Sequence, residues 1–386
     1  MASSTESIDP RVLKRYDATQ KIGQGAYGVV WKAVNRKDGK TVALKKCFDA
    51  FRCDVDAQRT YREVMYLKAL SEGDGHPNIV KLLDLIRSNN DRDLYISFEY
   101  METDLSQVIK ARILEHSHIQ YITYQLLCAL KFIHSAKLLH RDIKPSNILV
   151  DSSCAIKICD FGLCRSISTD AESGGGLVLT DYIASRWYRS PEVLMGSRRY
   201  TEGIDLWSVG CIVGEMFRTR PLLPGASSMA QIERIFELTG NPTAHDVKSW
   251  QSQFATAMLE NVQAKSRVRL DDLCHNLPRD AKHLMKSLFK LDPTKRGTAS
   301  SALEHDYAKD FHNPEKEIVY PHGAIKIGID DSTKMKSHEY RTALYQKIDE
   351  QKRSLALQSM PLTAPDINTR STTVSYDSLD YPSNRR

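Results

Sequence analysis

Long apolar runs, runs of like charge and paired-cysteine motifs are all missing from this sequence. No apolar run approaches the roughly 18 residues that a membrane-spanning helix needs, and the first six residues lack the basic and apolar pattern of a secretory signal. We therefore expect no membrane span and no leader. The lysines and arginines nowhere form a block of five or six, so the net charge of +6 indicates a solvated, mildly basic surface and no nucleic-acid site.

The eight cysteines are spaced neither as C-x-x-C pairs nor as a zinc-binding set. Most of them lie in apolar runs, as Cys159 does. This usage favours reduced thiols in a cytoplasmic or nuclear compartment over disulfides or bound zinc. No internal repeat is apparent, and the chain of 386 residues is long enough for about two lobes at roughly 100–200 residues each.

Glycines stand at the first, third and sixth places of residues 23–28, within a strand-like stretch that runs from residue 16 to about residue 100. Glycines so spaced let backbone N–H groups approach a polyphosphate without interference from Cβ atoms. The pattern alone also fits a dinucleotide-binding turn or a plain glycine-rich hairpin. Because residues 29–34 continue as a β-branched strand and the chain then turns at residues 37–40, we favour a glycine flap on a β-hairpin.

Lys45 ends a second apolar strand, at residues 41–45, and Lys46 follows it directly. Strand alternation sends these two side chains to opposite faces, so we expect Lys45 to point inward and Lys46 to point to water. An inward ammonium needs an anionic partner. The helical stretch at residues 54–70 offers Glu63, and we expect Lys45 and Glu63 to pair near bound phosphates, although a helix carboxylate taken alone more often faces solvent.

The polar turn at residues 140–147 carries Asp142 and Asn147 five positions apart, and Asp160 follows in an Asp-Phe-Gly triplet. One carboxylate can orient a hydroxyl nucleophile, while the amide and the other acid hold Mg²⁺ against phosphates. Each of these residues taken singly could be an ordinary surface residue. The order of glycine flap, strand lysine, helix glutamate, His-Arg-Asp-x-x-x-x-Asn and Asp-Phe-Gly satisfies a signature of many parts, so we predict a phosphoryl-transfer site.

With this signature the chain resembles a eukaryotic protein kinase across residues 16–311. The resemblance implies an α+β fold, with a β-rich N-lobe at residues 16–100, a helical C-lobe at residues 105–311, and ATP and Mg²⁺ between them. The catalytic residues that it implies are Asp142 for the substrate hydroxyl, Lys144 for the γ-phosphate, and the pair of Lys45 and Glu63. The metal ligands that it implies are Asn147 and Asp160. The ATP-binding residues that it implies are Ile22, Gly23, Gln24, Gly25, Ala26, Tyr27, Gly28, Val29, Val30, Ala43, Lys45, Phe98, Glu99, Met101, Asp104, Asn147, Leu149 and Asp160.

Thr180 and Tyr182 precede an Arg-Trp-Tyr-Arg run, which is the pattern of mitogen-activated protein (MAP) kinases. This resemblance implies that phosphates on the two residues switch the enzyme by adding charge that arginines bind. The arginines that it implies are Arg62, Arg141 and Arg165 for Thr180, and Arg186 and Arg189 for Tyr182. Without phosphate we expect the first three to be unpaired and to repel one another. The pocket shaped by Tyr182 is expected to accept proline, which has no N–H, after the phosphorylated Ser or Thr.

Within this family the chain is similar to the extracellular-signal-regulated kinase seven/eight branch, in segments such as residues 48–52, 56–60 and 90–93. That similarity implies autophosphorylation of the Thr-x-Tyr pair and a location at basal bodies or cilia besides the cytoplasm or nucleus. Two other readings stay open. One is a cyclin-dependent-type kinase with a partner on the Glu63 helix, and the other is a catalytically weak scaffold that keeps the fold for binding.

Further contacts follow from the family pattern. Glu192, in a Ser-Pro-Glu triplet that replaces Ala-Pro-Glu, is expected to pair with Arg296, and Asp205 is expected to bond the backbone of the catalytic turn. Residues 313–317 stand where the family binds basic docking peptides. Lys316 dilutes the acidic charge there, which puts docking through this patch in doubt.

The remaining segments are assigned by composition and pattern. Residues 1–15 are expected to form an N-terminal extension, residues 312–350 a C-terminal extension that packs on the kinase core through a helix, and residues 351–386 a disordered tail rich in Ser and Thr. Protein substrates with Ser/Thr-Pro sites are the expected partners, and the chain is expected to be a monomer.

Overall fold

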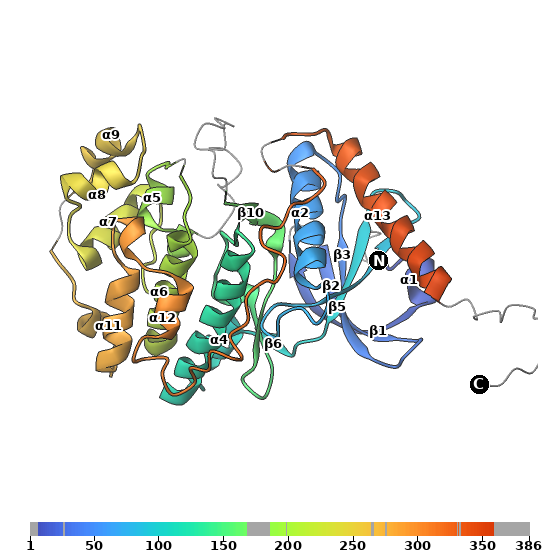
Figure 1. Cartoon of the computed structure of the whole chain (residues 1–386), viewed down its shortest axis with the longest axis horizontal. Coiled ribbons are helices and arrows are strands. Elements are labelled where there is room, and N and C mark those ends of the chain that lie inside the picture. Colours follow the sequence, from blue (N-terminus) through green and yellow to red (C-terminus); the bar gives the residue numbers. More distant parts are fainter. Residues whose placement is uncertain are drawn as a thin grey trace, which may run out of the picture.

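The computed structural model describes residues 7–25, 28–167, 186–197, 199–263, 266–274, 276–329, 331 and 333–358, and only the backbone of 351, 352 and 354–358. Figure 1 shows two lobes, with an antiparallel sheet and helix α2 on the right and a group of helices on the left. The last helix, α13, lies on the lobe that holds the sheet. The predicted α+β fold, with a β-rich lobe followed by a helical lobe, is confirmed.

Five antiparallel strands form the sheet of the first lobe, in the order β1-β2-β3-β5-β4. They are β1 (Tyr16–Gly25), β2 (Gly28–Asn35), β3 (Thr41–Cys47), β4 (Leu82–Arg87) and β5 (Leu94–Glu99), with α1 (Pro10–Leu13) before them and α2 (Asp54–Leu70) between β3 and β4. Strands β1 and β2 pair as a hairpin that sets Gly25 opposite Gly28. The predicted glycine flap on a hairpin is confirmed, and the dinucleotide-binding turn is excluded because a strand follows the glycines in place of a helix.

The outer face of this sheet is covered, which makes the expectation that Lys46 points to water wrong. Lys46 is only 4% exposed, and its Nζ donates to the carbonyl oxygen of Ser7 at 2.9 Å and pairs with the carboxylate of Asp93 at 3.2 Å. Alternation does send Lys45 and Lys46 to opposite faces. The N-terminal residues around α1 lie over the outer face, the one that carries Lys46, and bury a small apolar cluster there.

The second lobe is built around two long helices, α4 (His116–Ser135) and α6 (Gly203–Arg218), whose side chains are largely buried. Its other helices are α3 (Leu105–Ala111), α5 (Pro191–Leu194), α7 (Ser228–Thr239), α8 (Ala244–Ser249), α9 (Ala255–Leu259), α10 (Leu270–Leu273), α11 (Arg279–Leu288) and α12 (Ala299–Leu303). Short strands run between the lobes: β6 (Thr103–Asp104), β7 (Leu138–Leu139), β8 (Ile148–Val150), β9 (Ile156–Ile158) and β10 (Arg165–Ser166). These strands hold the loops that carry the candidate site.

After α12 the chain runs back along the second lobe to the first, where it forms α13 (Ser337–Gln358) (Figure 1). Tyr340, Leu344 and Ile348 of α13 are buried, and the Tyr340 ring lies 5.5 Å from that of Tyr61 on α2. A helix that packs back on the core was predicted and is confirmed. The helix extends beyond the predicted boundary at residue 350, and residues 359–386 of the expected tail lie outside the described part of the chain.

One large apolar cluster runs through both lobes and joins α2, α4, α6 and α11. All eight cysteines are free thiols, as their spacing predicted. Among the helices that the structure describes, none has the length and apolar character needed to cross a bilayer.

Candidate active site

Asp205, at the start of α6, holds the backbone of the catalytic turn. Its carboxylate accepts hydrogen bonds from the backbone N–H of His140 at 2.9 Å and of Arg141 at 2.8 Å, and its Oδ2 lies 2.9 Å from Nε2 of His134. Arg141 has a φ of 67°, a left-handed conformation that costs a non-glycine residue free energy and needs such support. The predicted bond between Asp205 and this turn is confirmed.

Asp142, Lys144 and Asn147 converge within the turn. Nζ of Lys144 lies 2.6 Å from Oδ2 of Asp142, and Nδ2 of Asn147 donates to the same Oδ2 at 3.0 Å and to the Asp142 carbonyl at 2.9 Å. Among the described residues no donor bonds Oδ1 of Asp142 or Oδ1 of Asn147. Both oxygens therefore stay available to a bound molecule.

Lys45 on β3 and Glu63 on α2 form the predicted ion pair, with Nζ and Oε1 2.5 Å apart. The side chain of Glu63 is buried and that of Lys45 is partly buried. Burial alone would lower the pKa of Lys45, but the carboxylate of Glu63 outweighs that effect and raises it. The ammonium of Lys45 is therefore charged at every physiological pH.

Asp160 follows β9 in a left-handed conformation, with a φ of 63°, and its carboxylate lies among cations. Burial would raise its pKa, but Lys45, Arg59 and Lys144 together hold the pKa at about 2. Arg59 on α2 donates to Oδ2 of Asp160 at 3.1 Å. Sequence reasoning missed Arg59, although it lies four residues before Glu63 and so on the same face of α2.

Lys45 pairs with Glu63 and also interacts electrostatically with the carboxylate of Asp160. The predicted residues of the two lobes therefore lie close together. A backbone hydrogen bond adds to this, because the N–H of Cys159 donates to the carbonyl of Asn147 at 2.9 Å. Asn147 directly precedes β8 and Asp160 follows β9, and because these strands are antiparallel with Ile148 opposite Ile158, the two residues lie at the same end of the pair.

The strand register sorts the predicted ATP-binding residues of the sheet by face. Val30 lies opposite Lys45, and Ala43 lies opposite Phe98, so these side chains share the inner face. Val29 lies opposite Lys46 and is fully buried, so its side chain does not share the face that holds Lys45, and its place in a nucleotide site stays a prediction. The other predicted residues of this hairpin are Ile22, Gly23, Gln24 and Gly25 on β1 and Gly28 on β2, while Ala26 and Tyr27 lie outside the described residues.

The predicted link between the lobes begins where β5 ends. Glu99 accepts from the backbone N–H of Lys81 at 2.7 Å and pairs with Lys157 at 3.1 Å, and Met101 lies half-buried just beyond. Asp104 caps α3 through its Oδ1 and lies opposite Leu149 in the β6–β8 pair. The side chains of Glu99 and Asp104 thus have structural partners of their own.

The expectation that the clamp arginines are unpaired without phosphate is wrong for Arg62. Its Nε lies 2.9 Å from Oδ1 of Asp331, a residue of the C-terminal extension. Arg141 donates to the carbonyl of Leu163 at 3.3 Å and lies over the ring of Tyr200, 4.7 Å from its centroid. The sequence carries no signal for the contact with Asp331.

The remaining clamp residues lie on either side of a segment that is not described. Arg165 belongs to β10, which pairs with β7, and Arg186 donates to the carbonyl of Ala226 at 3.1 Å. Thr180 and Tyr182 lie outside the described residues, so the predicted phosphate contacts stay predictions.

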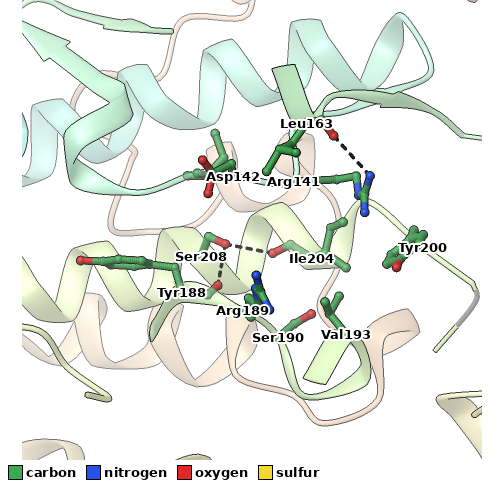
Figure 2. Close-up of a pocket in the computed structure, with 11 residues that line it drawn as sticks. Arg141, Asp142, Leu163, Tyr188, Arg189, Ser190, Val193, Tyr200, Ile204 and Ser208 are labelled. Carbon is green, nitrogen blue, oxygen red and sulfur yellow. Dashed lines mark hydrogen bonds between the residues drawn. The ribbon is translucent and has the colours of Figure 1, made fainter. Parts of the chain in front are cut away.

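A small cavity of about 30 Å³ lies beside Asp142, between the catalytic turn and residues 188–193 (Figure 2). Arg189 and Tyr200 line it. Figure 2 shows Ser208 bonded to the carbonyl of Tyr188, at 2.8 Å, and Tyr188 bonds Glu215 at 2.6 Å. These contacts with α6 fix the cavity wall.

The acidic patch predicted to be diluted is weaker still in the structure. Glu317 is buried, and its carboxylate contacts Lys131 at 3.3 Å and Nδ1 of His312 at 2.6 Å. Of the acidic residues at 313–317, only Glu315 is exposed, next to the exposed Lys316.

Comparison with known proteins gives the family. The model of the protein kinase domain matches residues 16–308. The chain is 50% identical over 364 residues to extracellular signal-regulated kinase 2 of Dictyostelium discoideum, which covers 94% of this chain and 98% of that protein. It is 47% identical to mitogen-activated protein kinase 15 of Xenopus laevis and 44% identical to that of Caenorhabditis elegans, over 92% and 91% of this chain.

The chain spans 60% of the length of the Xenopus laevis relative and 74% of the Caenorhabditis elegans one. These relatives do not favour a cyclin-dependent-type kinase or a weak scaffold. The chain therefore belongs to the protein kinase family, within the mitogen-activated protein kinases, which are proline-directed serine/threonine kinases.

Proposed function

We propose that this kinase binds ATP and Mg²⁺ between the inner face of the sheet and the catalytic turn, phosphorylates Ser or Thr followed by proline, and is switched by phosphates on its own Thr180 and Tyr182. The proposal rests on the convergence of four separate segments. They bring together the ion pair of Lys45 and Glu63, the carboxylate of Asp142 beside Lys144, and the carboxylate of Asp160.

The donor set fits a magnesium ion. Mg²⁺ prefers oxygen ligands and takes few of them from the protein, together with waters and phosphate oxygens. Oδ1 of Asn147 and the ionised carboxylate of Asp160 are ligands of this kind. Arg59 shares the Asp160 carboxylate and would yield one oxygen to the ion. When bound, Mg·ATP supplies the transferable phosphoryl group.

The protein's own residues bind the phosphates and orient the substrate hydroxyl. Lys45, held by Glu63, offers its ammonium to phosphate oxygens, and Lys144 offers a second cation beside Asp142. Because Lys144 and Asn147 both bond Oδ2 of Asp142, Oδ1 is left to accept the hydrogen bond of the substrate hydroxyl and to take its proton.

The cavity beside Asp142 suits the residue after the phosphorylated Ser or Thr. Proline there leaves no N–H without a partner. We propose that protein substrates bind chiefly at this site, because Glu317 is buried and the docking patch keeps little exposed acidic charge. A monomer in the cytoplasm, with a nuclear or basal-body fraction, completes the proposal, and imaging of the tagged full-length chain tests the location.

The direct test compares Asp142→Asn with the wild-type chain on a Ser-Pro peptide and its Ser-Ala counterpart. We expect wild type to label the Ser-Pro peptide preferentially and Asp142→Asn to be slower by about 10²–10⁴-fold, the usual worth of a positioned general base. Asp38→Asn, in the exposed turn before β3, serves as the matched control and should keep wild-type activity. Equal labelling by Asp142→Asn would refute the assignment.

The switch has its own test. Thr180→Ala should lower activity far more than Ser173→Ala in the same segment, because only the first removes the phosphate that the clamp binds. Phosphatase-treated wild type incubated with Mg·ATP should regain phosphate on Thr180 and Tyr182 by mass spectrometry, and Asp142→Asn should not. Equal activity of the two alanine variants would sink the switch, and unmodified Thr180 and Tyr182 would count against autophosphorylation.

A further inference from the structure

The carboxylate of Asp331 joins the C-terminal extension to two parts of the kinase core. Its Oδ1 accepts from Nε of Arg62 at 2.9 Å, and its backbone carbonyl accepts from Nη2 of the same arginine at 3.1 Å. Its Oδ2 accepts from the hydroxyl of Tyr66 at 2.5 Å and from the backbone N–H of Ser166 at 2.8 Å. Arg62 and Tyr66 lie on α2, and Ser166 lies on β10, so one carboxylate holds both elements together.

The site is built for an anion. Arg62 is 5% exposed and Tyr66 is fully buried, and a buried guanidinium needs a paired, hydrogen-bonded anion. Burial raises the pKa of Tyr66 and the charge of Asp331 raises it further, so the hydroxyl keeps the proton that it donates. A carboxylate and a phosphate are alike in what they offer a guanidinium, namely anionic oxygens that accept short, charge-assisted bonds.

The extension grips α2 along most of its length. The backbone N–H of Ser337 donates to Asp54 at the first turn at 2.8 Å, and Gln58 donates to the hydroxyl of Tyr340 at 3.0 Å. The hydroxyl of Tyr61 accepts from the backbone N–H of Ile329 at 3.1 Å. Asp331 differs from the other residues that make these contacts. It also accepts a hydrogen bond from Ser166, at the beginning of the segment that follows Asp-Phe-Gly.

This contact coexists with an assembled catalytic pair. Glu63, the neighbour of Arg62 on α2, bonds Lys45 at 2.5 Å, and Phe161 of the Asp-Phe-Gly triplet is fully buried. We propose that Asp331 is a positioning residue, which supplies to Arg62 an anion from the C-terminal extension and so holds α2 and β10 in the catalytic arrangement before Thr180 is phosphorylated.

The inference rests on the proposed function and gives it a starting point. A kinase that phosphorylates its own segment must carry out the first transfer without the phosphate that later orders it. An anion built into the chain meets that need, because it orders α2 without any modification. Once Thr180 carries phosphate, Arg62 has a second anionic partner, and the contribution of Asp331 to activity becomes small.

The experiment measures kinase activity of the full-length chain in two states, phosphatase-treated and fully phosphorylated, with initial rates on a Ser-Pro peptide. We compare wild type with Asp331→Asn, which keeps the shape and loses the charge, and with Asp331→Glu, which keeps the charge. Asp54→Asn is the matched control, because Asp54 also joins the extension to α2 but reaches neither Arg62 nor β10.

We expect Asp331→Asn to lower kcat of the phosphatase-treated kinase, and its rate of autophosphorylation, by tenfold or more, and to lower kcat of the phosphorylated kinase by less than threefold. Asp331→Glu should keep at least a third of the wild-type rate, and Asp54→Asn should affect both states alike. An equal loss in both states, as from a merely weakened fold, or no loss in the phosphatase-treated state, overturns the inference. A wild type inactive in both states would instead refute the proposed function.

Discussion

Individual buried residues in this kinase have their protonation fixed by their surroundings. His140 is fully buried, and its Nδ1 accepts from the N–H of Asp142 while its Nε2 donates to the carbonyl of Cys159. Burial lowers the pKa of His140, so the ring is neutral and carries its proton on Nε2. One neutral ring thereby connects the catalytic turn to the residue before Asp160.

His76 offers a test of this principle away from the site. Burial, with the charge of Lys157, lowers its pKa to about 4, whereas an unfolded histidine titrates near 6.5. Between these pH values the histidine binds more protons in the unfolded chain than in the folded one. Its contribution to the free energy of unfolding is therefore fully present above pH 6.5 and is lost as the pH drops toward 4. We expect about 2 kcal/mol to be lost at pH 5 for this group.

The measurement is urea denaturation of wild type and His76→Asn at pH 7 and pH 5. The asparagine can still accept the bond that the N–H of Asn78 gives to Nδ1 of His76 at 3.0 Å. The difference between the two proteins isolates this residue from all other titrations. The same pH dependence in both proteins would show that His76 does not contribute.

At the scale of elements, one buried ion pair joins three parts of the second lobe. Arg296 binds Glu192 of α5 with two bonds of 2.6 Å, and it also donates to the carbonyl of Gly203 at the start of α6 at 3.0 Å. Both charged side chains are essentially unexposed. The pair predicted from the sequence is confirmed, and its two parallel bonds fix the angle between α5 and α6.

Replacing only Arg296 should lower the free energy of unfolding more than replacing both Arg296 and Glu192. We expect Arg296→Leu to lower the free energy of unfolding by about 3–5 kcal/mol, because it leaves the Glu192 carboxylate buried without a cation. The double variant with Glu192→Leu should lose less than the sum of the two single variants, as denaturation midpoints will measure. Additive losses would mean that the two side chains are not coupled.

At the scale of the whole molecule, the C-terminal extension runs from the second lobe to the first and contacts both. On the second lobe the backbone N–H of Ile325 donates to the carbonyl of Ala136 at 3.0 Å, and Tyr320 donates to Ser135 at 2.8 Å. On the first lobe α13 packs on α2. The two lobes are thus held by the link, by Asp331 and by this outer strap.

Leu344 tests the strap, because its side chain is completely buried between α13 and the core. We expect Leu344→Ala to lower the free energy of unfolding by about 2–5 kcal/mol through loss of burial and the cavity left behind. Kinase activity should fall as well, since α13 supports the helix that carries Glu63. Gln346→Ala, at an exposed position of the same helix, is the control and should change neither quantity.

Much of the site followed from the order of motifs along the chain. The pair of Lys45 and Glu63, the bonds of Asp205 to the catalytic turn, and the pair of Glu192 and Arg296 were all expected and are all present. Such contacts are predictable because each motif fixes its local geometry, and the family resemblance supplies how the motifs meet.

The sequence by itself determined the two kinds of lobe, the hairpin of the glycine flap and the faces to which Lys45 and Lys46 turn, because strand and helix periods are local properties. Only the tertiary structure decided what covers those faces, and this cover buries Lys46. It also decided that Arg62 meets Asp331, 269 residues further along the chain. Nothing local marks such a partner, because long-range ion pairs are selected by the packing of whole elements.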